Sequence, residues 1–541
     1  MLEGFRVCLL SAVLGSVLVG CGGGGRGTVV GGSGGGGETP APPAEVAQHN
    51  VACAALPAAL RTSFTDLKLV SATEVAATSA LPAYCDVRGT IKNNVKFAVY
   101  LPKDWNGRFQ MVGNGGKAGS ISFPAMVSAI QEGYATSSTD TGHDTTITAQ
   151  SGARFGYDAE FGDEMEIDFA YRAVNLTARA SKEIINAHYP KTIEYSYWNG
   201  CSTGGRQGLM EAQRFPEDFD GYVIGAPVNN YTRQQLSAPA TLQHLYKNGI
   251  RGGNVLSQTK RDLVGNIIYN GNGTNYPGCD AMDGLKDGQI RNPLACNFHP
   301  EIHVPACGAT DEPTCLTTAE LTALQGVYAG HPTNSVHPLP VGSENIASGW
   351  SSWLVPDSPT GTPSLHTVMV DAFQYLMFQP DRPTFDYLTQ LDWNSDPYQM
   401  EKAKQLYNAT NPDLRAFAAA GKKIVMYHGW ADAGVNPLGT IEYKNNVNSL
   451  FGGDTAVNSF MKLYMIPGMG HCSGGPGHNN VDWMGHVSNW VEKGQAPTSV
   501  IGTKIVGGVT SRRPHCPYPS EAVYNGTGDV NAAASFTCRT L

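Results

Sequence analysis

The sequence predicts an α/β fold in which a large inserted segment interrupts the core. A strand-like run over residues 193–198 passes through a glycine-rich turn into a helix-like run over residues 206–214. Two further apolar strand-like runs, at 423–427 and 462–466, each end in a loop. Residues 227–420 lack a clean alternation of strands and helices, which predicts the insertion.

The first strand-like run leads into a G-x-S-x-G motif centred on Ser202. Alone, this motif is a weak signal in a chain with 64 glycines. Strand, sharp turn and helix in this order, however, are the geometry of a nucleophile elbow, whose glycines let the backbone turn and expose the hydroxyl. We therefore predict that Ser202 is a nucleophile. The alternative is a glycine-rich turn with an idle serine.

A serine nucleophile needs a general base and an acid that orients the base. The run at 423–427 leads into a loop with Asp432, and the run at 462–466 leads into a loop with His471. The chain order Ser, Asp, His is that of α/β-hydrolases. We predict a triad of Ser202, Asp432 and His471, against the alternatives of an ordinary loop carboxylate and an ordinary loop histidine. Nearby competitors fit the strand-end position less well: His428, His478, Asp482 and His486.

Two cysteines flank the predicted nucleophile and base, because Cys201 precedes Ser202 and Cys472 follows His471. With these and other motifs, the chain resembles the tannase and feruloyl esterase family of α/β-hydrolases, which includes mono(2-hydroxyethyl) terephthalate hydrolases. The resemblance implies that the family's nucleophile, acid and base fall on the predicted triad. It also implies a disulfide between Cys201 and Cys472. The resemblance runs from about residue 52 to the C-terminus, and its motifs lie at 112–116, 138–143, 200–208, 428–432 and 467–472.

Stabilising an oxyanion requires two preorganised N–H donors. The backbone N–H of Thr203, directly after the nucleophile, is the first candidate. Residues 108–112 alternate as a strand would and lead into a glycine-rich loop at 113–116. By resemblance the second donor is Gly115, with Gly116 next, whereas the alternative is an ordinary glycine turn. Two nearby polar residues are interpreted as structural supports: Asp140 and His143.

Residues 279–290 hold three aspartates at short spacing, with glycines between them. Carboxylates in such a loop can surround a hard cation with oxygen atoms, although the spacing is not that of an EF-hand. The resemblance implies a structural calcium ion here, and the alternative is a solvated acidic turn. The implied ligands are the side chains of Asp280, Asp283 and Asp287 and the backbone carbonyls of Leu285 and Gln289.

The N-terminal region predicts export. Residues 7–21 form an apolar stretch that is too short to span a bilayer and resembles a signal peptide. Its end resembles a bacterial lipobox, which predicts that Cys21 is lipidated, while the alternative is a plain signal peptide cleaved nearby. The glycine-rich residues 22–45 would then tether an outer-membrane lipoprotein that faces the periplasm or the cell surface. The net charge of −9, without a basic run, argues against a nucleic-acid partner.

The cysteine content also favours an oxidising compartment. Twelve cysteines less Cys8 and Cys21 leave an even set of ten. The sequence contains no C-x-x-C pair, which argues against a cytosolic metal site. The alternative, a cytosolic protein with reduced cysteines, conflicts with the predicted signal peptide. Proximity in sequence and the family pattern together imply the pairs Cys53–Cys85, Cys201–Cys472, Cys279–Cys296, Cys307–Cys315 and Cys516–Cys538.

After the leader at 1–21, these observations divide the chain into an α/β-hydrolase core in two parts, 46–226 and 421–541, and an inserted lid at 227–420. The family has a lid at this position, and lids commonly supply the pocket for the acid side of the substrate. Aromatic candidates for that pocket, each more often simply lid core, are Trp350, Trp353, Phe373, Tyr375 and Phe378. Arg382 could pair with a substrate carboxylate, but a surface arginine is the simpler interpretation.

The residues by themselves predict a serine ester hydrolase that works through an acyl-enzyme. The resemblance adds the substrate class, an ester of an aromatic acid of the feruloyl, galloyl or monohydroxyethyl terephthalate type. One alternative is a different serine enzyme, such as a peptidase or an acyltransferase. The other is a non-catalytic surface-binding lipoprotein, against which the complete Ser, Asp and His set argues.

Overall fold

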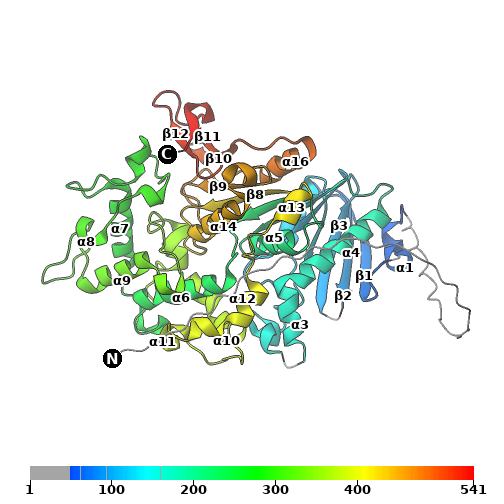
Figure 1. Ribbon diagram of the computed structural model, residues 1–541, viewed down its shortest axis with the longest axis horizontal. Helices are drawn as coiled ribbons and strands as arrows, with labels where there is room; N and C mark the ends of the chain where they lie inside the picture. The colour runs from blue at the N-terminus through cyan, green and yellow to red at the C-terminus, as the bar shows by residue number, and fades with distance from the viewer. Residues whose placement is uncertain (1–48, 61, 93, 159, 541) are drawn as a thin grey trace, which may run out of the picture. The chain divides into compact units, whose positions relative to one another are not determined.

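The computed structural model describes residues 49–60, 62–92, 94–158 and 160–540. The predicted signal peptide, the lipidation site Cys21 and the tether therefore lie outside the described residues. The centre of the described part is a large sheet with helices on both faces (Figure 1).

The largest sheet in these residues has nine strands in the order β1-β2-β3-β5-β4-β6-β7-β8-β9. The pairs from β1 to β5 are antiparallel, and those from β5 to β9 are parallel. The central strands are short and covered on both sides, and β5 and β7 are buried throughout, as parallel strands require, although β5 consists mainly of Ser and Thr. The strands are β1 (Leu67–Val75), β2 (Tyr84–Ile91), β3 (Val95–Pro102), β4 (Arg108–Val112), β5 (Ala135–Thr139), β6 (Tyr195–Cys201), β7 (Gly221–Gly225), β8 (Lys423–Gly429) and β9 (Met461–Ile466).

This topology gathers the predicted site residues at one edge. The carboxyl ends of parallel strands lie on the same side of a sheet, which is where open α/β sheets bind their ligands. Ser202 directly follows β6, Asp432 lies just beyond β8, and His471 lies in the loop after β9. The predicted α/β class is thus confirmed, and the predicted triad positions follow three strands that end at this edge.

Helices cover the two faces of the sheet through separate apolar clusters. On one face, α4 (Ala173–His188), α5 (Thr203–Arg214) and α14 (Pro437–Phe451) pack against the inward side chains of the strands. On the other face, α2 (Phe123–Gln131) and α16 (Trp483–Lys493) do the same. The strands that carry the site are therefore held from both sides.

The segment between β7 and β8 contributes no strand to the nine-stranded sheet within the described residues. It is mainly helical, and most of its helices share an apolar core with part of the preceding segment, around Phe155 and Phe169. The last helix, at 415–419, packs instead with the apolar cluster of the main sheet. Residues 46–541 nevertheless form one compact unit, so the lid boundaries at 226 and 420 stay a prediction. Its helices are α6 (Tyr231–Leu245), α7 (Gln258–Asn270), α8 (Pro300–His303), α9 (Thr318–Ala329), α10 (Ser364–Tyr375), α11 (Tyr387–Gln390), α12 (Glu401–Tyr407) and α13 (Arg415–Ala419).

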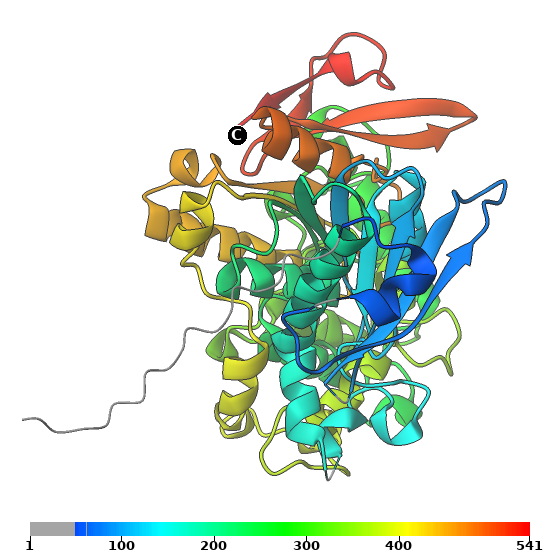
Figure 2. The same ribbon diagram turned by 90° about the vertical axis from the view of Figure 1, so that its right-hand side faces the viewer.

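Two small antiparallel pairs follow α16 near the C-terminus (Figure 2). Within the described residues, we find no helix that is both long and apolar enough to cross a membrane. The strands are β10 (Val500–Val506), β11 (Val509–His515), β12 (Glu521–Tyr524) and β13 (Phe536–Arg539). The remaining short helices are α1 (Leu56–Ala59), α3 (Gly162–Ile167) and α15 (Asp454–Val457).

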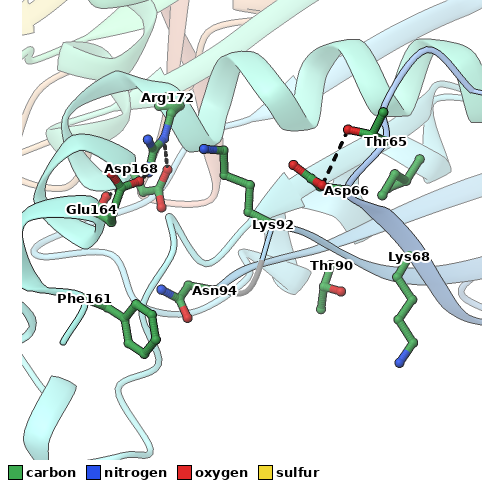
Figure 3. A pocket seen from close by; sticks show the side chains of 11 residues that line it. Thr65, Asp66, Lys68, Thr90, Lys92, Asn94, Phe161, Glu164, Asp168 and Arg172 are labelled. Carbon is green, nitrogen blue, oxygen red and sulfur yellow. Dashed lines mark hydrogen bonds and ion pairs between the residues drawn. The ribbon is translucent and has the colours of Figure 1, made fainter.

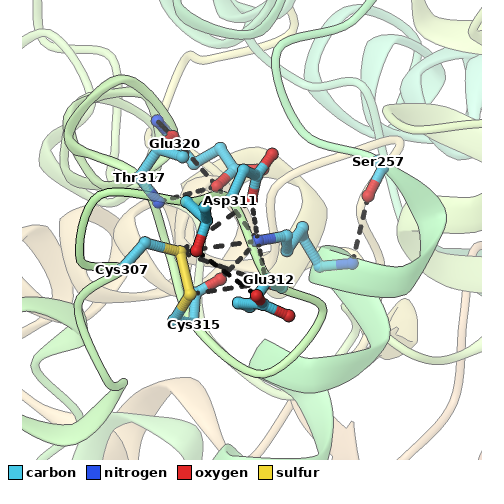
Figure 4. Close-up of polar contacts among 9 residues, drawn as sticks. Ser257, Cys307, Asp311, Glu312, Cys315, Thr317 and Glu320 are labelled. Atoms are coloured by element: carbon cyan, nitrogen blue, oxygen red, sulfur yellow. Dashed lines mark hydrogen bonds and ion pairs between the residues drawn. A yellow bond between two sulfur atoms is a disulfide. The ribbon is translucent and has the colours of Figure 1, made fainter.

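The ten cysteines of the described residues form the five expected disulfides. Four of these close local loops, whereas Cys201–Cys472 joins residues 271 positions apart. The Cys307–Cys315 loop (Figure 4) is also held by a lysine from α7. The buried Nζ of Lys260 lies 2.5 Å from the carbonyl oxygens of Glu312 and Cys315. Disulfide bonding is thus a main device by which this chain secures its loops.

Candidate active site

Ser202 sits at a sharp turn between β6 and α5. Its backbone has φ 63° and ψ −122°, in the left-handed half of conformational space that a non-glycine residue rarely adopts. The strain is held in place because the Ser202 N–H donates to the Gly225 carbonyl (3.0 Å) and the Arg206 N–H donates to the Ser202 carbonyl (3.0 Å). The side chain thus projects from a rigid elbow at the N-terminus of α5.

Two glycines of the elbow, Gly200 in the motif and Gly205 directly after it, are required by close backbone contacts. A Cβ on Gly200 would lie 2.6 Å from the backbone of Gly204. A Cβ on Gly205 would lie 2.4 Å from the carbonyl oxygen of Gly225 on the neighbouring strand. Both distances are shorter than a real Cβ contact allows, so glycine at these two positions is a steric requirement of the elbow.

Asp432 and His471 form a close pair at the ends of β8 and β9. The His471 Nδ1–H donates to Asp432 Oδ2 at 2.7 Å. Asp432 is 1% exposed, and its Oδ1 accepts the N–H groups of Gly434 (2.9 Å) and Val435 (2.8 Å). Burial opposes the ionised form of Asp432, but the charge of His471 and the hydrogen bonds outweigh it and lower the carboxyl pKa. Burial likewise lowers the pKa of His471, but Asp432 outweighs it and raises that pKa.

A second histidine, His428, also contacts the buried carboxylate. Its Nε2 lies 3.2 Å from Asp432 Oδ2 and 3.0 Å from the carbonyl oxygen of Val435. A carbonyl can only accept, so Nε2 carries the proton, and Nδ1 accepts from the Thr440 hydroxyl at 2.8 Å. The sequence presents His428 only as a rival base. Its spacing of four residues before Asp432, at the end of the same strand, is the signal that could have suggested this supporting contact.

The Cys201–Cys472 disulfide joins the nucleophile elbow to the histidine loop, with the two Cα atoms 6.0 Å apart. It brings the immediate neighbours of Ser202 and His471 together, although they are far apart in sequence. Among the described residues, no hydrogen bond joins the Ser202 hydroxyl to His471. Such contacts are often long in a ligand-free site and tighten when substrate binds.

The glycine-rich loop after β4 packs directly against the elbow helix. The Asn114 N–H donates to Gln207 Oε1 and the Gln207 amide donates back to Asn114 Oδ1, both at 3.0 Å. The Asn114 side chain also donates to the carbonyls of Thr139 (2.8 Å) and Ser120 (2.9 Å). Asn114 thus fixes this loop to α5 and β5. We missed its role, because its partner lies 93 residues away in the sequence.

The next two residues of this loop, Gly115 and Gly116, are exposed, and a Cβ on either would meet no atom within 4 Å. The Thr203 hydroxyl donates to the Gly116 carbonyl, which ties the loop to the first residue of α5. The two predicted oxyanion donors therefore lie in segments that contact each other, with open space over the glycines.

Comparisons with known proteins identify the family of this chain. The family model described as "Tannase and feruloyl esterase" matches residues 78–539. The chain belongs to the tannase and feruloyl esterase family. Members of this family are named as esterases and ester hydrolases, and this chain is a carboxylic ester hydrolase.

Several members of this family are similar over most of their length. The mono(2-hydroxyethyl) terephthalate hydrolase of Piscinibacter sakaiensis is 31% identical over 536 residues, covering 86% of this chain and 87% of that protein. A probable feruloyl esterase of Arthroderma benhamiae is 31% identical over 457 residues, covering 81% of each. The crystal structure of feruloyl esterase B from Aspergillus oryzae superposes with a TM-score of 0.74 and 28% identity, covering 88% of this chain and 98% of that one.

Of the five lid aromatics singled out from the sequence, all of them described, Trp353 is the one in ring contact with His471, the predicted base. Its ring stands edge-on to His471, with centroids 5.3 Å apart, and it also packs against the Cα of Gly434 beside Asp432. Arg382 pairs with Asp396 at 2.8 Å and covers the Phe378 ring, so it serves the lid itself. The other four aromatic candidates are buried in the lid core: Trp350, Phe373, Tyr375 and Phe378.

Asp140 and His143 lie under the oxyanion loop and take no part in the Asp432–His471 pair. Asp140 Oδ1 accepts the N–H groups of Lys96 and Gly142, each at 2.9 Å, while burial raises the carboxyl pKa to about 7. His143 stacks on Phe155 at 4.0 Å, and burial lowers its pKa to about 4. These contacts agree with the interpretation of both residues as structural supports.

The aspartate loop at 279–290 is a compact turn closed by Cys279–Cys296. Asp280 accepts backbone N–H groups from residues 287–289, and Asp287 pairs with Arg513 at 2.9 Å. In donor chemistry the loop suits a hard cation. Across the described parts of the chain, however, no three His, Cys, Asp or Glu side chains are arranged to hold a metal ion.

The loop also contacts the base loop, because the Gln289 Oε1 atom lies 3.3 Å from Nδ1 of His478. His478 follows His471 by seven residues in the same loop. The aspartate loop therefore supports the segment that carries the predicted base.

A surface cavity of about 780 Å³ lies away from these residues, between β1, the turn after β2 and the helical segment at 161–172 (Figure 3). Its charged side chains partly neutralise one another, since Arg172 pairs with Asp168 at 2.6 Å and with Glu164 at 2.5 Å. None of the predicted site residues lines this cavity.

Proposed function

We propose that this esterase cleaves esters of aromatic acids through a triad of Ser202, Asp432 and His471. The observation that carries the proposal is the Asp432–His471 pair, tied by the Cys201–Cys472 disulfide to a strained serine elbow. Strain at a non-glycine residue persists only where surrounding contacts enforce it, and it is concentrated at functional sites.

The reaction proceeds in two acyl-transfer steps. Asp432 holds the His471 Nδ1 proton, which leaves Nε2 free to take the proton of Ser202 as the hydroxyl attacks the ester carbonyl. His471 then gives this proton to the departing alcohol, and an acyl-enzyme remains. Water, activated by the same histidine, attacks the acyl-enzyme and releases the aromatic acid.

The tetrahedral intermediates carry a negative oxygen, which two N–H groups stabilise. Thr203 supplies one from the N-terminus of α5, where helix N–H groups lack partners within the helix. Gly115 supplies the other, supported by its exposed position and the open space around it. Asn114 and Gln207 hold the two segments in register.

In this proposal the aromatic acid part of the substrate binds against the lid. Trp353 brings a large apolar ring beside His471, and an edge-to-face or stacked aromatic contact stabilises a bound ring. The relatives are named for feruloyl esters and mono(2-hydroxyethyl) terephthalate, and the family model is named for tannase as well, which makes a galloyl ester the third candidate. Methyl ferulate, methyl gallate and mono(2-hydroxyethyl) terephthalate are therefore the substrates to compare.

The test is turnover of the three esters by the purified enzyme and its Ser202→Ala variant. We expect hydrolysis of at least one ester, lost by a factor of about 10⁴ or more in the variant. Labelling by a fluorophosphonate, present in the wild type and absent in the variant, checks the nucleophile separately. Labelling without turnover of any of the three esters would reject the aromatic-acid class and leave a different serine hydrolase.

We further propose that the loop at 279–290 holds a structural calcium ion. The side chains of Asp280, Asp283 and Asp287 and the carbonyls of Leu285 and Gln289 would be its ligands, and no step of the reaction passes through it. Bound calcium would neutralise the carboxylates and stiffen a loop that touches the base loop.

Chelation tests this second proposal. We expect EDTA to lower the melting temperature, and added calcium to restore it, with little change in the rate of enzyme that stays folded. The Asp283→Asn variant should bind calcium more weakly and melt lower. Equal melting temperatures with and without chelator would reject the site.

We also propose that the enzyme is exported and held at a membrane by a lipid attached to Cys21. Five disulfides support an oxidising compartment. In bacterial cells, the Cys21→Ser variant should move from the membrane fraction to a soluble fraction. An unchanged membrane association would reject lipidation at Cys21.

A further inference from the structure

The oxyanion loop is attached to the lid as well as to the core. Lys117 lies two residues after Gly115, and its Nζ donates to the carbonyl of Val368 and to Asp371 Oδ1, the latter at 2.7 Å. Both partners belong to α10 of the segment between β7 and β8. The Lys117 side chain is only 9% exposed, so its charge depends on these partners rather than on water.

Asp371 is itself held from a second side. Its Oδ2 accepts the Ala153 N–H at 2.7 Å. Gly152 adopts φ +62°, and a Cβ there would lie 2.0 Å from this oxygen, so the glycine lets the loop approach the carboxylate closely. Asp371 is therefore a fixed point on α10 to which the lysine can be anchored.

The same loop is held by the core at its other positions. Asn114 is bound to Gln207, and the Gly116 carbonyl accepts from the Thr203 hydroxyl. Contacts from α5 thus hold the loop just before and just after Gly115, and contacts from α10 hold it one residue further on. Gly115 itself is exposed, so these neighbours determine the direction of its N–H group.

We propose that Lys117 and Asp371 are a positioning pair that couples the placement of lid helix α10 to the geometry of the oxyanion hole. This inference rests on the proposed function, because it assigns the pair a role in aligning the Gly115 N–H with the oxyanion. A lid that moves away from the site pulls on Lys117 and misaligns the donor. The pair thus favours catalysis with α10 docked.

Kinetics of Lys117→Met and Asp371→Asn test the pair. We expect kcat to fall about 10- to 100-fold in each variant with KM changed much less, because the oxyanion forms only during the reaction. The double variant should lose no more than the worse single variant. Lys117→Arg, which keeps a charged donor, should retain most of the rate.

A matched control is Lys444→Met. Lys444 is a buried lysine whose Nζ lies 2.7 Å from Asp454, and both residues lie outside the oxyanion loop and α10. We expect this control to lose stability to a similar extent but to keep its kcat. An unchanged kcat in folded Lys117→Met, or an equal fall in kcat in the control, would overturn the proposal.

Hydrogen exchange supplies a readout that does not depend on turnover. In the wild type the hydrogen-bonded amides of Gly113, Asn114 and Ala118 should exchange slowly. In Lys117→Met and Asp371→Asn these three amides should exchange faster, with β6 and β8 unaffected. Unchanged exchange in this loop would overturn the coupling even if the esterase reaction fails. If the wild type hydrolyses none of the tested esters but exchange in this loop changes as expected, the result counts against the proposed function and not against the coupling.

Discussion

At the scale of single residues, Asp432 is the most constrained side chain of the site. One carboxylate oxygen accepts two backbone N–H groups, and the other accepts two imidazole N–H groups, from His471 and His428. Four donors keep a fully buried carboxylate ionised. The anion in turn keeps the His471 proton on Nδ1, which leaves Nε2 unprotonated as the proposed mechanism requires.

The pH dependence of the Asp432→Asn variant tests this arrangement. Asp432 raises the pKa of His471 above its ordinary value of 6.5, and the base works only when neutral, so wild-type kcat/KM should rise with pH through that raised pKa. In the variant the rise should move to lower pH, while the plateau falls about 10⁴-fold. A pH profile with an unmoved midpoint would contradict the assigned pair.

At the scale of elements, three loops at one sheet edge are each fixed by a specific contact. The elbow is joined to the base loop by Cys201–Cys472, and the oxyanion loop is joined to the elbow helix by Asn114 and Gln207. Loops that end parallel strands can vary in position without disturbing the sheet. These cross-links remove that freedom where about 1 Å of displacement can cost about 100-fold in rate.

Replacing both Cys201 and Cys472 by serine tests whether this disulfide maintains the geometry of the site or only the stability of the fold. We expect kcat to fall about 100-fold, since the base is no longer tied to the elbow, while binding of ferulic acid is largely kept. The matched control replaces Cys307 and Cys315, whose bond closes only a local lid loop. It should lower the melting temperature and leave kcat unchanged. Full turnover in the first variant would contradict the tethering argument.

Local patterns predicted the elbow, the order of the triad positions and the strand ends, because each depends on a few consecutive residues. Contacts between distant segments could not be predicted in this way. The sequence places Asn114 only within a glycine-rich loop and gives no signal for Lys117, because their partners lie 93 and 254 residues away in the chain. The lid aromatics show the converse limit, because most of them fill the lid core rather than face the site.

At the scale of the whole molecule, the enzyme keeps buried carboxyl groups that resist ionisation. Burial raises the pKa of Asp140 to about 7 and that of Glu166 to about 6. The folded state therefore holds protons that the unfolded chain has already lost, so stability falls as pH rises from about 4 to about 7. Asp432 has a lowered pKa and acts in the opposite direction, at lower pH.

The Asp140→Asn variant tests this contribution. Asparagine can still accept the Lys96 and Gly142 N–H groups, and its amide replaces Oδ2, which has no hydrogen-bond partner. We expect melting temperature to fall less steeply with pH in the variant between about pH 4 and pH 7 than in the wild type. Parallel curves for the two proteins would show that Asp140 does not titrate in this range.

The most direct test of the proposed reaction is the mass of the trapped acyl-enzyme. The enzyme would be mixed with methyl ferulate, methyl gallate or mono(2-hydroxyethyl) terephthalate, quenched in acid within milliseconds, and digested for mass spectrometry. The account predicts an acyl group of the cleaved ester on the peptide that contains Ser202, and no adduct in the Ser202→Ala variant. Turnover that persists in that variant, or an adduct on another residue, would contradict it.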